Sequence, residues 1–132
     1  METINWQGNI TFLYYDDLAR ADEFFQKTLN LSLILDQGWA KVYRISAGAF
    51  LGAVDKTRGS VRASSPDGVL VGFVVQNFDQ VVAELAQRGI EFINPPAQNP
   101  EIGIKSVMFF DQEGYKFEVQ EFLLEQDIKE FY

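Results

Sequence analysis

The stretch NITFLYYDDLARADEFFQKTLNL, which runs from Asn9 to Leu31, holds the signals that decide the fold. Its opening NITFLYY is mostly β-branched and aromatic, a composition that favours a β-strand. Asp16 and Asp17 follow as suitable N-caps for a helix. Apolar residues then recur at helical spacing and end near Asn30. A strand followed directly by an amphipathic helix is therefore predicted.

The same order of elements occurs twice along the chain. After the first helix, the pattern predicts three strands at 31–35, 40–45 and 50–55. The second half gives a strand at 69–75, a helix around 78–85 and strands at 90–93, 104–110 and 115–122. The sequence thus predicts an α+β fold made of two tandem β-α-β-β-β units. We expect one domain over 1–132, with unit one at about 8–56, a linker at 57–68, unit two at about 69–122 and a tail at 123–132.

Three connecting or terminal segments leave alternatives open. Lys56 to Gly68 is rich in turn residues and basic groups, so it reads as a surface linker or as a loop that closes over an anionic ligand. Asn94 to Gly103 contains three prolines and is a second linker or candidate lid. The tail from Glu121 to Tyr132 predicts a short helix whose apolar side docks on this chain or on a partner.

Composition excludes several classes of function. The chain has no histidine and no cysteine, which removes Ser-His-Asp triads, thiol nucleophiles and the usual zinc sites. The 19 acidic residues outweigh the 11 basic ones, giving a formal net charge of -8. This charge makes nucleic acid and anionic membranes poor partners. With no disulfide framework, no apolar span and no signal peptide, we expect a cytoplasmic protein that does not enter membranes.

Two segments resemble the vicinal oxygen chelate superfamily, which includes glyoxalases, bleomycin-resistance proteins and extradiol dioxygenases. YYDDLARADEFFQKTLNL, at 14–31, is similar to the family's strand-helix opening, and FFDQEGYKFEVQEF, at 109–122, is similar to its closing hairpin. The resemblance covers nearly the whole chain. It implies mixed sheets that curl around a concave cleft, a small-molecule ligand and a homodimer.

Family members that bind a metal hold it with four side chains, from the first and last strands of each unit. The last of these positions matches Glu118 in this sequence. Aligning the two halves places Gly52 opposite Glu118, and it places Asn9 or Thr11 opposite Leu70. A single carboxylate beside a glycine and a leucine cannot supply the donors that a catalytic divalent ion needs. We therefore expect no metal cofactor, with Glu118 as the one residual candidate ligand.

Glu118 and two aromatic residues are the other candidates for ligand contact. Strand alternation points Glu118 into the concave face, where it binds a cationic or hydroxyl-bearing ligand, acts as a base, or merely pairs with Lys116. Trp39 follows a glycine turn at the rim of the expected cup, and Tyr43 lies on the same predicted strand. Either ring can line a pocket for a planar ligand or pack in the core.

These observations leave three functions open. The first is a metal-free binding protein of the bleomycin-resistance type that holds a cationic or aromatic ligand in an acidic, aromatic-lined cleft. The alternative is a divergent lyase, isomerase or dioxygenase in which Glu118, with Asp55 or Tyr43, holds Mg²⁺ or Mn²⁺ through oxygen ligands. The third is an interaction module whose cup is filled by its own aromatic side chains or by a partner's tail.

Overall fold

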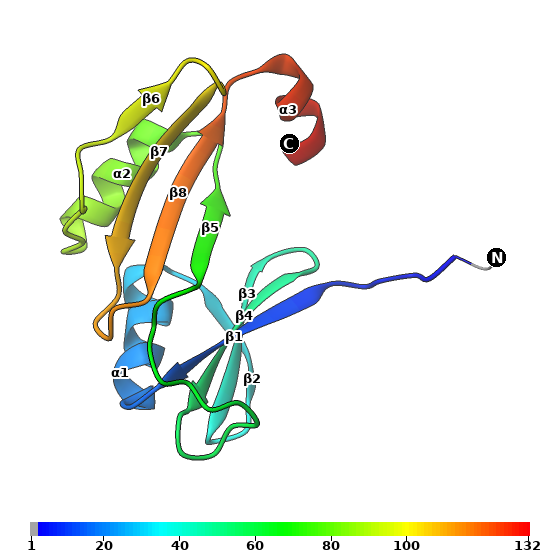
Figure 1. Cartoon of the computed structure of the whole chain (residues 1–132), viewed down its shortest axis with the longest axis vertical. Helices are drawn as coiled ribbons and strands as arrows, with labels where there is room; N and C mark the ends of the chain where they lie inside the picture. The colour runs from blue at the N-terminus through cyan, green and yellow to red at the C-terminus, as the bar shows by residue number, and fades with distance from the viewer. Residues whose placement is uncertain (1–2) are drawn as a thin grey trace. The chain divides into compact units, whose positions relative to one another are not determined.

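The computed structural model describes residues 3–132 and divides the chain between Ser64 and Ser65 into two compact units (Figure 1). Each unit consists of one four-stranded mixed sheet and the helices that pack on it. Over residues 3–132, every helix is too short or too polar to cross a membrane.

Unit 1 contains a sheet with the strand order β1-β4-β3-β2. Strands β1 and β4 pair in parallel, and the other neighbours are antiparallel. The elements are β1 (Asn9–Tyr15), α1 (Leu18–Glu23), the π-helix η1 (Phe24–Thr28), β2 (Ser32–Asp36), β3 (Ala40–Ser46) and β4 (Ala49–Asp55).

Unit 2 repeats this arrangement with the strand order β5-β8-β7-β6 and one parallel pair, β5 with β8. Its elements are β5 (Leu70–Val74), α2 (Phe78–Gln87), β6 (Ala97–Asn99), β7 (Ile104–Phe110), β8 (Lys116–Phe122) and α3 (Glu125–Phe131). The predicted α+β fold of two tandem β-α-β-β-β units is confirmed.

The core of unit 1 lies between the helix and one face of the sheet. Phe25 is fully buried there, with its ring centroid 5.8 Å from that of Tyr15 and 5.1 Å from that of Tyr43. Leu13 and Leu51, from the two parallel strands, fill the rest of this layer. Because strand side chains alternate, these residues leave the opposite face of the sheet to their neighbours in sequence.

The core of unit 2 uses a stack of rings on the sheet itself. Phe117 lies between Phe109 and Phe73, at centroid distances of 5.4 and 6.0 Å and with nearly parallel planes. The helix contributes two buried side chains, Phe78 at its start and the smaller Leu85 near its end. At its start, the Phe78 N–H donates to a Glu121 carboxylate oxygen on β8 at 3.0 Å, which fixes α2 on this face of the sheet.

The first helix ends where the sequence predicts, but its last turn is wider than expected. The Leu29 N–H donates to the Phe24 carbonyl at 3.0 Å, a five-residue step typical of a π-helix. Asn30 then adopts a φ of 56°, the left-handed conformation that commonly closes a helix. Apolar spacing does not distinguish such a π-turn from regular helix.

The predicted strand at 90–93 is wrong, apart from a single bridge between Phe92 and Phe109. The Ile90 N–H is already used to close α2 on the Leu85 carbonyl. Pro95 and Pro96 then provide no N–H for a ladder. A continuous strand beside β7 therefore begins only at β6, inside the segment that the sequence suggested as a linker or lid.

The C-terminal tail packs on its own unit. The Phe131 ring in α3 stacks on the Phe122 ring of β8, with centroids 4.1 Å apart and planes 4° from parallel. The Tyr132 hydroxyl donates to the Val75 carbonyl and accepts from the Phe122 N–H. Of the two alternatives for the tail, the structure shows docking on this chain.

Candidate functional site

The face of the unit 1 sheet opposite the helix carries an open, apolar groove of about 640 Å³. A volume of this size is typical of small-molecule sites. The residues that line it come from the arm before β1 and from all four strands: Gln7, Gly8, Asn9, Ile10, Phe12, Ile34, Leu35, Val42 and Phe50. No Asp or Glu is among these lining residues, so the walls of the groove are apolar rather than acidic.

Gly52 makes room for an aromatic wall of this groove. It pairs with Phe12 on β1 and Val42 on β3, in the middle of the sheet. A β-carbon at Gly52 would lie 2.3 Å from the Phe12 ring, far inside contact distance. The missing side chain therefore lets the Phe12 ring lie across β4, and Gly52 shapes the groove through its neighbour.

The segment after β4 covers one end of the same sheet face. Asp55 accepts from both the N–H and the hydroxyl of Thr57, which lowers the pKa of its carboxyl and holds the chain in a tight turn. Gly59 then lies against Tyr14 and Val54, where its β-carbon would be 2.1 Å from the Tyr14 ring. The start of the expected linker is thus packed on unit 1.

Trp39 lies at the turn before β3 and is 37% exposed. The Arg58 guanidinium lies over its ring, 5.6 Å from the centroid. Trp39 is not among the residues that line the groove. Arg58 therefore already occupies one face of this ring, and ligand contact at Trp39 stays a proposal.

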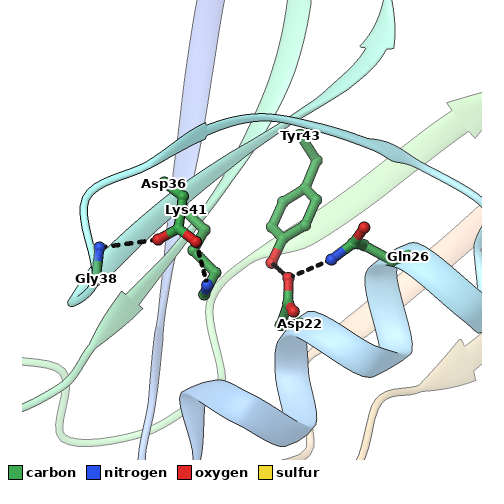
Figure 2. Close-up of polar contacts among 6 residues, drawn as sticks. All are labelled: Asp22, Gln26, Asp36, Gly38, Lys41 and Tyr43. Atoms are coloured by element: carbon green, nitrogen blue, oxygen red, sulfur yellow. Dashed lines mark hydrogen bonds and ion pairs between the residues drawn. The ribbon is translucent and has the colours of Figure 1, made fainter.

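Tyr43 faces the helix instead of the groove (Figure 2). Its side chain is fully buried, and its hydroxyl donates to an Asp22 carboxylate oxygen at 2.6 Å. Burial, followed by this hydrogen bond to a carboxylate, raises the pKa of Tyr43 far above its ordinary value of 10.0. The same Asp22 oxygen accepts from the Gln26 amide. Tyr43 thus joins helix and sheet, and we leave it out of the proposed site.

The corresponding face of unit 2 carries the one carboxylate that the sequence singled out. Glu118 pairs with Gly72 on β5 and with Met108 on β7. It is half-buried, and this desolvation raises the pKa of its carboxyl. The Gln120 amide donates to it at 2.5 Å. The Lys116 ammonium, one of the partners suggested for Glu118, lies instead over the Phe110 ring. The neutral Gln120 amide takes its place beside the carboxylate.

Strand register corrects one of the predicted positions. In unit 2, Leu70 pairs with Lys116, two residues after the turn glycine Gly114. In unit 1, the residue at the matching place on β4 is Phe50, and its partner on β1 is Ile10. The residue equivalent to Leu70 is therefore Ile10, and the alignment with its neighbours was wrong by one position. A shift of one residue exchanges the two faces of a strand.

This correction places Thr11 on the helix side, because it pairs with the buried Leu51. Asn9, the other neighbour, starts β1 and is part of the groove wall. The sequence therefore named Asn9 and Gly52 near the groove but missed Ile10, Phe12 and Phe50. The sequence NITFLYY does not distinguish its two faces, because both carry apolar residues; the structure does so by burying Leu13 and Tyr15 in the core.

The residues at the four family positions do not fit a metal. Unit 1 contributes Ile10 and Gly52, and unit 2 contributes Leu70 and Glu118. Only the last of these has a donor atom in its side chain. Within residues 3–132, no three Asp or Glu side chains are grouped so that they could hold a metal ion. We therefore derive no chemistry from a metal at these positions.

Solved structures with the same fold differ widely from this chain in sequence. A glyoxalase/bleomycin resistance protein/dioxygenase from Nocardioides is 23% identical, with a TM-score of 0.75 over 95% of this chain and 88% of that one. TioX from Micromonospora sp. ML1 is 18% identical, with a TM-score of 0.74 over 88% and 98%. A lactoylglutathione lyase from Agrobacterium tumefaciens is 22% identical, with a TM-score of 0.68 over 85% and 90%. These similarities show the fold alone.

The family itself is identified from the sequence. None of the curated proteins is a significant match. Residues 7–119, however, match the Glyoxalase/Bleomycin resistance protein/Dioxygenase superfamily, and they run from the arm before β1 into β8, the last strand of unit 2. The chain belongs to the glyoxalase/bleomycin resistance protein/dioxygenase superfamily.

Proposed function

We propose that this protein binds an aromatic small molecule on the uncovered face of its unit 1 sheet, without the family metal. The observation that carries the proposal is the apolar groove, in which the Phe12 and Phe50 rings stand beside aliphatic side chains. Flat rings and aliphatic walls favour a flat, apolar ligand body. The proposal needs neither histidine nor a nucleophile, in keeping with the composition.

The absence of donors at the family metal positions supports binding over metal chemistry. A metal-dependent lyase, isomerase or dioxygenase would need at least three ligands, and unit 1 offers only Ile10 and Gly52. The partners suggested for Glu118 have other roles: Tyr43 is held by Asp22, and Asp55 is held by Thr57. This reading of the site favours a binding protein.

A cationic ligand is the second candidate, and Glu118 is the observation that favours it. Its half-buried carboxylate accepts from the neutral Gln120 amide and takes part in none of the ion pairs within residues 3–132. A positively charged group placed there would remove the cost of holding an unpaired charge away from water. The net charge of -8 would also favour the approach of such a ligand at low ionic strength, where distant charges are less screened.

A thermal-shift screen tests the proposal. The panel contains catechols, glutathione conjugates, cationic antibiotics and divalent metals. A ligand present at about 100 times its Kd stabilises the folded protein by about 2.7 kcal/mol, which is a large shift. We expect aromatic compounds to raise the melting temperature, and we expect Phe12→Ala to abolish the shift.

Ile102→Ala is the matched control, because it also removes an exposed apolar side chain, 53% exposed against 45% for Phe12, from a turn outside the groove. This variant should keep the ligand-induced shift. Metal analysis of protein purified without chelators is the second arm. Near-stoichiometric divalent metal that disappears in Glu118→Gln would overturn the metal-free proposal.

The proposal includes two further predictions. The resemblance to the family implies a homodimer, for which sedimentation equilibrium should give twice the chain mass of 15.0 kDa. The cytoplasmic location, expected from composition, stays a prediction.

A further inference from the structure

Each sheet carries one cation stacked on one ring, at the same place on the face opposite its helix. In unit 1, the Arg44 guanidinium lies 5.0 Å from the centroid of Phe50, its cross-strand partner. In unit 2, the Lys116 ammonium lies 5.8 Å from the centroid of its partner Phe110. Phe50 on β4 and Lys116 on β8 are equivalent positions. Unit 1 therefore has the ring on this strand and the cation on β3, whereas unit 2 has the cation on this strand and the ring on β7.

Arg44 has no carboxylate partner within residues 3–132. The ion pairs of this part of the chain belong to other cations, namely Lys41, Lys56, Arg88 and Lys105. Arg44 is instead exposed at the edge of the apolar groove, with its charge available to a ligand.

Phe50 connects Arg44 to the groove. The Phe50 ring lines the groove, and the same ring carries the guanidinium. A guanidinium over a ring can stack on it and still donate through its remaining N–H groups. These groups have the spacing to bind a carboxylate through two parallel hydrogen bonds.

We propose that the unit 1 groove binds an aromatic carboxylate, with its rings against Phe12 and Phe50 and its carboxylate on Arg44. This inference rests on the proposed function and names its ligand class. The net charge of -8 does not exclude an anion, because distant charges are screened beyond about 8 Å at physiological ionic strength. The charge in contact with the ligand is that of Arg44.

Three probes with the same ring system test the inference by calorimetric titration of the full chain. They are naphthalene-2-carboxylate, the neutral naphthalene-2-carboxamide and the cationic 2-(aminomethyl)naphthalene. Charge-assisted hydrogen bonds contribute more than neutral ones. We expect the carboxylate to bind about tenfold more tightly than the carboxamide, and the amine to bind most weakly.

Arg44→Met keeps an apolar stem over Phe50 and removes only the charge. It should lower the affinity for the carboxylate about tenfold and leave the affinity for the carboxamide unchanged. Arg44→Lys should retain part of the preference for the carboxylate, since it keeps the charge but loses the planar edge. Lys116→Met is the matched control, because it removes the equivalent cation of unit 2, and it should change neither affinity.

The outcomes separate this inference from the proposed function. If the wild-type protein binds the carboxylate and the carboxamide equally, the carboxylate inference is wrong while aromatic binding stands. Tightest binding of the amine would also overturn it and would favour the cationic candidate. A loss of carboxylate preference in Lys116→Met but not in Arg44→Met would overturn the assignment to Arg44. If no probe binds, the proposed aromatic site itself fails.

Discussion

The two units share one topology but place a ring and a leucine on opposite sides of the core at one pair of equivalent positions. Phe25 in unit 1 and Leu85 in unit 2 follow their helix N-caps, Asp17 and Asn77, by the same number of residues. On the facing strand the sizes are reversed, since unit 1 has Leu51 where unit 2 has Phe117. A ring on the helix is thus exchanged for a ring on the sheet. The comparison teaches that total volume in this layer, rather than the identity at one position, is what the fold requires.

The largest expected effect concerns the ring on the first helix. Phe25→Ala should lower the free energy of unfolding by about 3–5 kcal/mol, because it removes a fully buried ring that contacts Tyr15 and Tyr43. Leu85→Ala, the equivalent change in unit 2, should cost about 2–3 kcal/mol, at the low end for leucine. Urea unfolding followed by circular dichroism measures both.

A pair of substitutions tests the exchange directly. Phe25→Leu leaves a void and Leu51→Phe overfills the same layer, so each alone should destabilise unit 1. The double variant has the leucine and the ring in the positions that unit 2 uses. It should be more stable than the sum of the two single losses of stability predicts. Strict additivity would show that the two positions do not compensate.

The next effect distinguishes the uncovered faces of the sheets. Gly52→Ala should cost about 1–3 kcal/mol and weaken binding of aromatic ligands, because the new methyl group meets the Phe12 ring. Gly72→Ala is the matched change on the face of unit 2, where the nearest atom is the Gln120 side-chain nitrogen at 3.3 Å, which needs to shift by only a few tenths of an ångström. It should stay within about 0.5 kcal/mol of the wild type. Equal losses in the two variants would contradict the assignment of Phe12 to a tightly fitted wall.

The smallest effect is a pH dependence of folding stability that comes from Glu118. The equivalent residue of unit 1, Gly52, has no group that titrates. Burial raises the pKa of Glu118 above its ordinary value of 4.5, so the folded state holds the proton more tightly than the unfolded chain does. The stability contribution of this proton is complete below the ordinary pKa and is lost as pH rises through the folded pKa.

Glu118→Gln should remove that loss, and the variant should gain stability relative to the wild type as pH rises. Because the carboxylate is only half-buried, the gain should be about 0.5 kcal/mol or less. Urea unfolding at about pH 4 and about pH 7 measures it. A gain that is larger at the lower pH would reverse the sign and refute the assignment.

Much of the fold could be predicted from the sequence because periodicity carries it. The β1 and α1 signals, the turn glycines and the repeat of their order place most elements within a few residues. Two features needed the three-dimensional structure. The π-turn at Phe24–Thr28 has the same apolar spacing as α-helix. The strand expected at 90–93 has suitable residues but forms only a single bridge to β7, because Pro95 and Pro96 provide no N–H to extend the ladder before β6.

The site was harder to predict, because it depends on which face each strand residue occupies. Aligning the two halves by sequence placed Asn9 or Thr11 opposite Leu70, whereas the equivalent residue is Ile10. An error of one residue assigns a strand side chain to the wrong face of the sheet. Tyr43 shows the same problem, since aromaticity alone does not reveal that its hydroxyl is held by Asp22. The sequence did not indicate Arg44 as a ligand contact. Its role depends on its position over the Phe50 ring and on the absence of a carboxylate partner within residues 3–132, and both are features of the three-dimensional structure.

The contact between Arg58 and Trp39 has a practical consequence. Indole emission is sensitive to a neighbouring cation and to water, and Trp39 has both within reach. Arg58 belongs to the segment that covers one end of the unit 1 sheet beside Tyr14. Trp6, the other tryptophan, is 81% exposed and provides a nearly constant aqueous background. The protein therefore carries its own optical reporter of movement in that segment, readable without any label.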